Sequence, residues 1–410
     1  MSSYPGNSRK TLSKSRIERP LIVIGVTHSQ TCLVLTGRLR ALREAGFRVV
    51  LIASPGALLD STAVREQIEA LPIPMRRGIA PLADLVSLFR LLKELFRLRP
   101  DITEFSTPKA GLLGNLAALL CGVPRRVYLL RGLRMETTFG LMRWVLRAME
   151  QLAAACSHVV LCNSQSLREQ AIALGIANPA KLQVLGPGSS NGVDVDRFTP
   201  SAIGVRGVHL RAPMIGYVGR LTRDKGVPEL IQAFDALLET EPAARLLLVG
   251  WFDESEDAIG PELRSSIERH PQIIRAGFVA DPSPCYRVLD VLVLPTHREG
   301  FPNVVLEAAA SGVPVITTLA TGSREAVLHG ITGLLVPPGD SKSLLEAMLQ
   351  LLANPERRRQ MGSAARKWVV ERFPQARIHA LSVALYKDLW QGRFEELAPT
   401  RVRGAAAVAD

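Results

Sequence analysis

Long hydrophobic runs are missing from this 410-residue chain, although 47% of its residues are hydrophobic. No apolar run reaches the roughly 18 residues that a membrane-spanning helix requires. Residues 1–20 are polar and basic, and they lack the apolar stretch of a signal peptide. We therefore expect a chain that is neither exported nor membrane-spanning.

Paired cysteines are missing as well. The number of cysteines is odd and none belongs to a Cys-x-x-Cys pair, the five being Cys32, Cys121, Cys156, Cys162 and Cys285. This spacing argues against a zinc knuckle and against a disulfide framework. A reducing, cytoplasmic location is expected.

Aromatic residues make up only 5% of the chain, and no nucleic-acid recognition motif is present, so we expect no nucleic-acid partner. Positive charge, in contrast, is concentrated in one half. Residues 1–210 contain 27 Lys and Arg against 14 Asp and Glu, whereas residues 211–410 contain 23 against 24. The basic half suits an anionic membrane surface or a phosphorylated substrate.

The length of the chain predicts two domains, because a single hydrophobic core stops growing at about 250 to 300 residues. A strand-helix-strand pattern, typical of a parallel α/β sheet, begins at residue 21 and recurs through the first half. The pattern predicts strands at 21–26, 48–53, 102–105, 127–130 and 158–162, and helices from about 31 to 45 and at 82–98, 111–120 and 141–155.

The same alternation restarts after Pro213. This second series predicts strands at 214–218, 245–249, 273–278, 291–295 and 313–317, and helices at 227–238 and 261–268. Residues 186–192 and 199–213 between the two series are rich in turn-forming residues. The fold class is therefore α/β, with two doubly wound Rossmann-like domains that face each other across a ligand-binding cleft.

The expected domain organisation follows from these patterns. It comprises a basic tail (1–20), an N-terminal Rossmann-like domain (21–198), a linker (199–213), a C-terminal Rossmann-like domain (214–372), a C-terminal helix that crosses back to the N-terminal domain (373–398) and a tail (399–410).

A glycine-rich loop, residues 219–226, follows the first strand of the second half and precedes a helix. Gly219 lets the backbone approach a ligand, and Arg220 and Lys225 beside a helix N-terminus suit a diphosphate. A solvated turn, in which both cations pair with Asp224 and Glu229, is equally compatible with this segment.

Two glutamates stand eight positions apart after the strand at 291–295, Glu299 in a loop and Glu307 in the following helix. Their carboxylates can accept hydrogen bonds from the hydroxyls of a sugar and a ribose. The backbone between them can hold a phosphate at the helix N-terminus, over Gly300, Phe301, Pro302, Asn303 and Val304. Glu307 taken alone could instead be a partner of the helix dipole.

This glutamate pair, together with similar segments over most of residues 214–340, resembles the donor domain of the retaining GT-B glycosyltransferases of family 4, the glycosyl transferases group 1, and among them capsule and exopolysaccharide enzymes. The resemblance implies a nucleotide-sugar donor whose pyrophosphate is bound by Arg220 and Lys225. It implies that Glu307 binds the ribose and that Glu299 contacts the transferred sugar. The backbone at Phe278 and Val279 would hold the nucleobase.

No metal or other cofactor is expected, because no Asp-x-Asp stands where a metal-bridging site would lie. The acidic run 253–257 is interpreted as a solvated surface loop rather than a metal site.

The first half departs from the family pattern in two loops. Thr27, His28 and Ser29 replace the double glycine that many relatives carry after the first strand, and we assign them to the acceptor side. Arg131-Gly132 replaces a His-Gly pair. Arg131 either contacts the donor sugar or phosphate or is an exposed loop cation, and His28 is either a general base or a structural residue.

The helix expected near residues 81–100 has a broad apolar face beside several cations. Packing against the sheet is favoured by the width of that face, and lying on an anionic leaflet is the alternative. Further basic residues of the first half, at positions 9, 10, 14, 16, 19, 76, 77, 125, 126, 143 and 147, lead us to expect peripheral association with the inner face of the plasma membrane.

The sequence thus predicts a retaining glycosyltransferase that extends a polysaccharide intermediate, with a polyprenyl-diphosphate-linked or other glycan acceptor. Two alternatives remain open: a nucleotide-sugar epimerase of the same fold, and a catalytically silent subunit that binds a nucleotide sugar.

Overall fold

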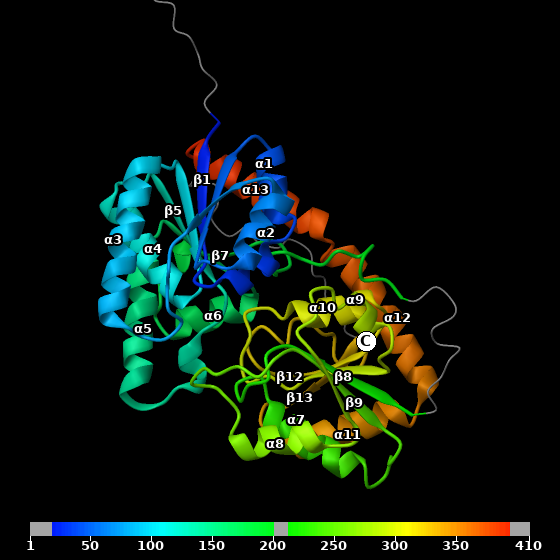
Figure 1. Cartoon of the computed structure of the whole chain (residues 1–410). Coiled ribbons are helices and arrows are strands. Elements are labelled where there is room, and N and C mark those ends of the chain that lie inside the picture. The colour runs from blue at the N-terminus through cyan, green and yellow to red at the C-terminus, as the bar shows by residue number, and fades with distance from the viewer. Residues whose placement is uncertain (1–18, 201–211, 394–410) are drawn as a thin grey trace, which may run out of the picture.

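The computed structural model describes residues 19–200 and 212–393, which form two parallel sheets with helices on both faces (Figure 1). Most of the expected basic tail and of the linker, residues 394–398 of the expected C-terminal helix and the whole expected C-terminal tail lie outside these residues. Within the described ranges, no helix combines the length and the apolar character needed to cross a bilayer.

The N-terminal sheet has seven parallel strands in the order β3-β2-β1-β4-β5-β6-β7. They are β1 Leu21–Gly25, β2 Arg48–Ala53, β3 Glu69–Pro72, β4 Ile102–Ser106, β5 Arg125–Leu130, β6 Val159–Cys162 and β7 Leu182–Val184. The helices of this half are η1 Ser29–Leu35, α1 Arg38–Glu44, α2 Ala57–Glu66, α3 Pro81–Leu98, α4 Pro108–Leu120, η2 Arg134–Thr137, α5 Gly140–Ala155, α6 Gln165–Ala173 and η3 Pro179–Lys181.

The C-terminal sheet has six parallel strands in the order β10-β9-β8-β11-β12-β13. They are β8 Met214–Val218, β9 Arg245–Val249, β10 Ile273–Gly277, β11 Val291–Leu294, β12 Val315–Thr318 and β13 Gly333–Val336. The helices are α7 Val227–Leu237, α8 Pro261–Arg269, α9 Ser283–Tyr286, α10 Asn303–Ala310, α11 Ser341–Leu352, α12 Pro355–Arg372 and α13 Gln375–Trp390.

The two doubly wound domains confirm the expected fold class. The helix expected from about residue 31 to 45 is wrong as one element, because Gly37 adopts φ +80° and separates η1 from α1. The edge strands β3 and β7 and the helices α2 and α6 were not expected. Both edge strands are short and partly exposed, because each pairs with another strand on one side only. They therefore lack the continuous apolar run that predicts a buried strand.

Both faces of the N-terminal sheet are buried, which explains why β1, and β2 after the exposed Arg48, are apolar. Ile22 and Ile24 of β1 point to one face and pack in a cluster with α1 and α13. Val23 points to the other face and packs with Leu91 of α3. The alternation of side chains along a strand produces these two core layers.

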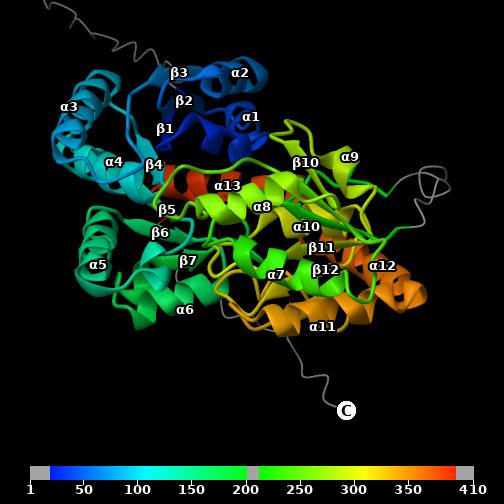
Figure 2. The ribbon, with the colours of Figure 1, turned by 60° about the horizontal axis from the view of Figure 1, so that its bottom comes forward.

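The last two helices divide between the domains (Figures 1 and 2). Helix α12 packs on α10 and α11 of the C-terminal domain, whereas α13 packs on α1 and β4 of the N-terminal domain. At the junction, the backbone N–H of Val193 donates a hydrogen bond to the carbonyl oxygen of Phe373 over 2.9 Å. The two segments that connect the domains therefore run side by side.

A buried ion pair fixes α13 on the N-terminal sheet. Arg38 of α1 donates from Nη1 to Glu104 Oε1 of β4 over 2.9 Å, and its Nη2 donates to the Tyr386 hydroxyl of α13, also over 2.9 Å. Burial alone would raise the pKa of Glu104, but Arg38 beside it holds that pKa below its ordinary value. Three elements that are distant in sequence thus share one satisfied charge network.

We predict that Glu104→Ala lowers the free energy of unfolding by about 3 to 5 kcal/mol, because Arg38 would stay buried without a counter-charge. Denaturant unfolding followed by circular dichroism measures the change. Glu69→Ala is the matched control, since the Arg48–Glu69 pair is about half exposed and is worth roughly 1 kcal/mol or less. Equal losses in the two variants would contradict the prediction.

Candidate active site

The candidate site lies where loops after β5 and β11 meet between the domains. The two backbones approach so closely that a Cβ at Gly300 would lie 2.3 Å from the carbonyl oxygen of Arg131. A Cβ at Gly322, in the loop after β12, would lie 2.4 Å from the carbonyl oxygen of Gly300. Glycine is therefore required at both positions, and the loop that carries Glu299 is held between the domains.

Side chains also bridge the cleft. Arg298 donates to Thr137 over 2.9 Å, and Thr321 donates to Glu136 over 2.7 Å. The Glu325 carboxylate accepts from the backbone N–H of Gln165 over 2.8 Å at the start of α6. The carboxyl ends of the two sheets are thus joined by polar contacts, which fixes the relative positions of their loops.

Arg220 follows β8 and lies at the cleft. Its Nη1 donates to Asp253 over 2.7 Å, and its Nη2 lies 3.9 Å from Asp224. Burial opposes the charge on Asp253, but the hydrogen bond from Arg220 lowers its pKa. Asp253 is only 8% exposed, so the interpretation of residues 253–257 as a solvated surface loop is wrong at this position.

Lys225 and Glu299 form an ion pair of 2.7 Å, and both side chains are largely buried. Lys225 also donates to the carbonyl oxygen of Arg298 over 3.2 Å. Gly226 follows at φ +71° and caps α7, whose unpaired N–H groups and dipole favour an anion. A lysine, an arginine and a helix N-terminus therefore lie together at one end of the C-terminal sheet.

Glu307 lies one turn into α10 and has a different partner from Glu299. Its Oε2 accepts from the Tyr286 hydroxyl of α9 over 2.6 Å. Burial raises the pKa of Glu307, and the hydrogen bond from Tyr286 opposes that rise. Of the solvated turn expected as an alternative for Arg220 and Lys225, only the contact of Arg220 with Asp224 at 3.9 Å is present, since Arg220 lies closer to Asp253 and Lys225 pairs with Glu299. The two glutamates do not share a partner.

The backbone between the glutamates opens α10. Pro302 precedes the helix, and Asn303 and Val304 belong to its first turn, where backbone N–H groups have no partner within a helix. Asn303 Oδ1 also accepts from Ser189 over 3.5 Å. Phe301 is buried against Phe373, with ring centroids 5.2 Å apart, which anchors the loop to the domain junction.

The loops after β8, β9 and β10 lie next to one another. Gly250 allows a close approach, since a Cβ there would lie 1.8 Å from the carbonyl oxygen of Gly219. Phe278 is 47% exposed, and its ring meets the ring of Trp251 edge-on at 5.7 Å. Val279 packs against the core. Sequence reasoning missed Trp251, although its position directly after a strand and a glycine matches that of Arg220.

Arg131 is not an exposed cation, so that interpretation of it is wrong. Its Nε donates to Ser106 over 3.2 Å and its Nη1 donates to Ser190 over 3.0 Å. Its Nη2 is buried and has no hydrogen-bond partner among the described residues. Burial lowers the pKa of Arg131 to about 10, with Glu104 opposing the shift, so the side chain stays charged at neutral pH.

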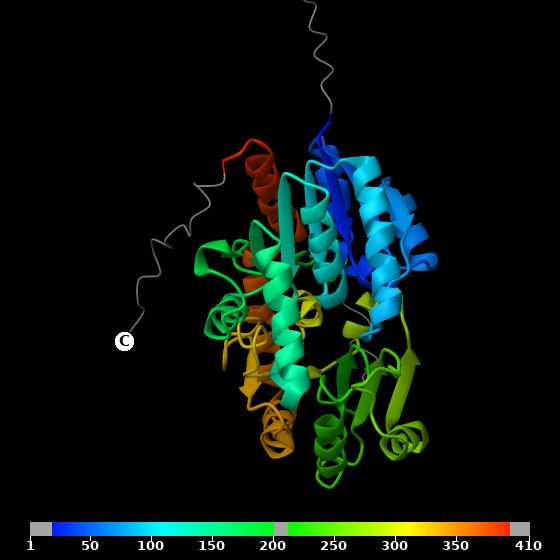
Figure 3. The same ribbon diagram turned by 90° about the vertical axis from the view of Figure 1, so that its left-hand side faces the viewer.

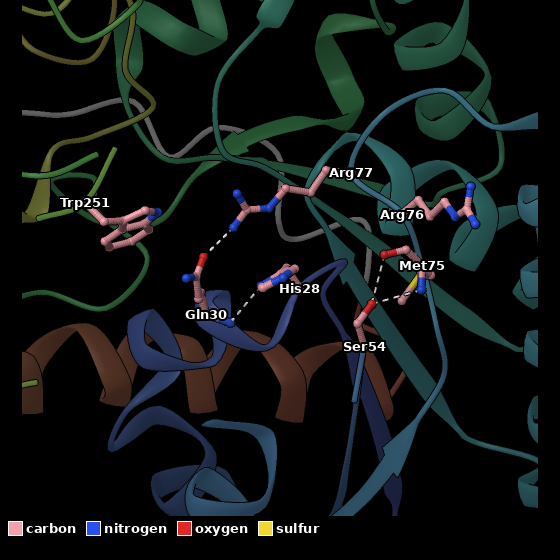
Figure 4. A pocket seen from close by; sticks show the side chains of 7 residues that line it. All are labelled: His28, Gln30, Ser54, Met75, Arg76, Arg77 and Trp251. Carbon is pink, nitrogen blue, oxygen red and sulfur yellow. Dashed lines mark hydrogen bonds between the residues drawn. The ribbon is translucent and has the colours of Figure 1, made fainter. Parts of the chain in front are cut away.

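A cavity of about 430 Å³ opens between the domains beside these loops (Figure 4). It is lined by His28, Gln30, Ser54, Met75, Arg76, Arg77 and Trp251. Arg77 crosses the cleft and donates to Asp253 over 3.2 Å, so one carboxylate joins Arg77 and Arg220. Burial and the nearby Arg77 lower the pKa of His28. The cavity is therefore lined by cations of the N-terminal domain.

Of the three residues assigned to the acceptor side, only His28 lines this cavity. Thr27 is buried, where its hydroxyl contacts the Thr107 hydroxyl at 2.6 Å and accepts from Ala110 N over 3.1 Å at the start of α4. Ser29 is buried against Gly56. Among the described residues, no group of three or more His, Cys, Asp or Glu side chains is placed to hold a metal ion.

Comparisons with known proteins identify the family of this chain. Residues 212–354 match the family Glycosyl transferases group 1, and residues 34–188 match the Glycosyl transferase 4-like domain. The capsular polysaccharide biosynthesis glycosyltransferase CapM of Staphylococcus aureus is 36% identical over 352 residues, which cover 85% of this chain and 92% of CapM.

A second relative is UDP-Gal:alpha-D-GlcNAc-diphosphoundecaprenol alpha-1,3-galactosyltransferase of Escherichia coli, 26% identical over 80% of this chain and 88% of the relative. Among solved structures, Anabaena HepE in complex with UDP and glucose has a TM-score of 0.73 at 21% identity, covering 89% of this chain and 99% of that one. Sucrose-phosphate synthase of Thermosynechococcus elongatus has a TM-score of 0.76 at 20% identity, covering 91% and 100%. The chain belongs to the glycosyl transferases group 1 family and is a nucleotide-sugar-dependent glycosyltransferase with the GT-B fold.

Proposed function

We propose that this protein is a retaining glycosyltransferase of bacterial polysaccharide assembly, and that it transfers a sugar to a glycan acceptor carried on a polyprenyl diphosphate. The observation that carries the proposal is the pairing of Lys225 with Glu299 at the N-terminus of α7, opposite a cation-lined cavity. The names of the capsular relative and of the relative that uses a diphosphoundecaprenol acceptor support the acceptor class.

In this proposal Arg220 and Lys225 bind the donor pyrophosphate. Each now contacts a carboxylate, Asp253 or Glu299, at the distance of a charge-assisted hydrogen bond. Phosphate oxygens would take the same donors. Negative charge develops on the diphosphate as it leaves, and fixed cations together with the backbone at the start of α10 would stabilise it without a metal ion. Gly219 and Gly300 leave room for the approach.

The two glutamates would bind hydroxyl groups of the donor. Tyr286 occupies only Oε2 of Glu307, so Oε1 is available to accept from a ribose hydroxyl. Glu299 would contact the transferred sugar from the loop beside Lys225. Phe278 and Val279 would hold the nucleobase through their backbone, and the exposed ring of Phe278 beside Trp251 offers an apolar wall.

Arg131 would donate from its free Nη2 to the donor sugar or phosphate. Two serine hydroxyls already orient its guanidinium, and its backbone contacts Gly300. An oriented, partly buried cation next to the reacting groups is the arrangement that electrostatic catalysis requires.

The acceptor would enter the cavity beside His28. Arg76 and Arg77 in its wall suit a phosphate-bearing acceptor, and both belong to the segment that follows β3. Because the pKa of His28 is lowered, its imidazole is neutral at pH 7. Its Nδ1 already accepts from the backbone N–H of Gln30 over 3.2 Å, so Nε2–H would donate a hydrogen bond to an oxygen of the acceptor.

Glu307→Ala is expected to weaken nucleotide binding by about tenfold or more, since a hydrogen bond to a charged group contributes roughly 1.5 to 3 kcal/mol. Thermal stabilisation by a titrated nucleoside diphosphate measures the affinity. Tyr286→Phe is the matched control, because it removes the neighbouring hydroxyl and keeps the carboxylate. Unchanged affinity in Glu307→Ala would contradict the assignment.

Arg131→Ala is expected to lower kcat by at least about tenfold while leaving nucleoside diphosphate affinity within a few-fold, because the proposed contact strengthens as charge develops. Arg131→Lys keeps the charge without the fork of donors and should recover part of the rate. Full turnover by Arg131→Ala would remove this residue from the mechanism.

The proposed reaction is tested with a panel of nucleotide sugars and a polyprenyl-diphosphate-linked sugar as acceptor. Transfer with the anomeric configuration retained, read by nuclear magnetic resonance of the product, is expected. An inverted product would overturn the retaining mechanism. Conversion of the donor without acceptor would instead indicate an epimerase, and nucleotide binding without any turnover would indicate a silent binding subunit.

A further inference from the structure

Two helices of the N-terminal domain expose large apolar side chains to solvent. On α3, Leu82 is 84% and Phe89 is 62% exposed; beside and within the start of α5, Phe139, Leu141 and Trp144 are 81%, 81% and 64% exposed. We refer to these five residues together with Val86 as the α3–α5 surface. A patch of this kind on a folded domain marks an interaction site.

Helix α3 buries one side and exposes the other. Leu91 and Leu95 pack into the core of the N-terminal sheet, as expected for a packed helix. Leu82, Val86 and Phe89 are spaced by four and three residues, so they form one stripe on the outer side. The expectation that the whole apolar face packs against the sheet is therefore only half right, and the outer stripe needs another partner.

The fold places the two exposed stretches at one edge of the domain. In a parallel α/β sheet, each helix starts where the preceding strand ends, and these strand ends face the cleft. The residues near the starts of α3 and α5 therefore lie on the cleft side. Helix α4 packs between the two helices, and Figures 1 and 3 show all three on the same side of the molecule.

The charges around the surface are positive. Arg90 and Lys93 of α3 and Arg143 of α5 are exposed and have no ion-pair partner among the described residues. The carboxylates on α3 are already used, because Asp84 pairs with Lys109 and Glu94 pairs with Arg97. The surface therefore presents apolar side chains flanked by unpaired cations.

We propose that the α3–α5 surface docks the enzyme on an anionic lipid bilayer. Phenylalanine, leucine and tryptophan enter the boundary between headgroups and acyl chains, and the cations contact anionic headgroups. Arg147, whose guanidinium stacks over Trp144 at 5.5 Å, reaches the same boundary. A second copy of the chain fits less well, because a two-fold contact would place this cationic surface against the same cationic surface of the other copy.

Docking in this orientation would also explain how the enzyme reaches its acceptor. That part of the proposal rests on the proposed function. Arg76 and Arg77 of the cavity lie a few residues before the start of α3 at Pro81. A bilayer against the α3–α5 surface would therefore bring the diphosphate of a polyprenyl-linked acceptor close to the cavity wall. The lipid tail could stay in the membrane while the sugar reaches the donor.

The test uses the full chain and two kinds of vesicle, phosphatidylcholine alone and phosphatidylcholine with phosphatidylglycerol. Co-sedimentation should show binding to the anionic vesicles that weakens as salt is raised. The triple variant Leu82→Ser, Phe89→Ser, Trp144→Ser should lose at least about tenfold in partitioning, since each side chain loses burial in the lipid. Arg90→Glu with Arg143→Glu should lose a similar factor at low salt.

The matched control carries serine at three exposed apolar positions of the C-terminal domain, Ile274, Leu328 and Ile331, which are 39%, 41% and 60% exposed. It should bind vesicles as the unmodified protein does. Thermal unfolding confirms that every variant is folded. Failure of the unmodified protein to bind anionic vesicles, or equal binding by the triple variant, overturns the proposal.

Two further measurements separate the alternatives. Light scattering that shows a dimer dissolved by the triple substitution overturns the proposal in favour of self-association. Transfer to a short-chain, water-soluble acceptor should be unchanged in the triple variant, whereas transfer to the polyprenyl-linked acceptor in vesicles should fall. Absence of transfer to both acceptors by the unmodified protein would instead contradict the proposed function, and vesicle binding would still decide the docking surface.

Discussion

The close contact between the backbones at Arg131 and Gly300 is the constraint on which the cleft depends. With only hydrogens on the α-carbon of residue 300, the loop after β11 can lie directly against the loop after β5, and Gly322 supports it from the other side. Any larger residue would push the domains apart. Glu299 and the start of α10 are positioned by this contact, so the proposed donor site depends on the N-terminal domain for its shape.

Charge is arranged around that contact in pairs rather than singly. Lys225 contacts Glu299, and Asp253 contacts both Arg220 and Arg77. Partly buried cations need such partners, because an unpaired charge in a low-dielectric site is costly. An anionic ligand that offers the same hydrogen-bond geometry can take the place of the carboxylates. The cations and carboxylates would then contact different groups of one bound nucleotide sugar.

The N-terminal domain combines two features that follow from one topological fact. All seven strands are parallel, so the loops that line the cavity and the starts of α3 and α5 lie at the same edge of the sheet. The cavity arginines and the exposed apolar side chains near the starts of α3 and α5 are thereby placed on the same side of the domain. Helix α13, held by the Arg38–Glu104–Tyr386 network, keeps this domain attached to the donor domain.

The sequence by itself determined the two-domain α/β fold, since apolar strands alternating with helices leave few other architectures, and it identified the Arg220, Lys225, Glu299 and Glu307 motif. Only the tertiary structure decided the partners of these residues, because Asp253 of a loop and Tyr286 of the short helix α9 lie in segments whose local sequence carries no signal of their contacts. It also decided that Arg131 is partly buried, with its Nη2 buried, while the outer face of α3 is exposed. Local periodicity gives the two sides of a helix, but which side is covered depends on neighbours that are distant in sequence.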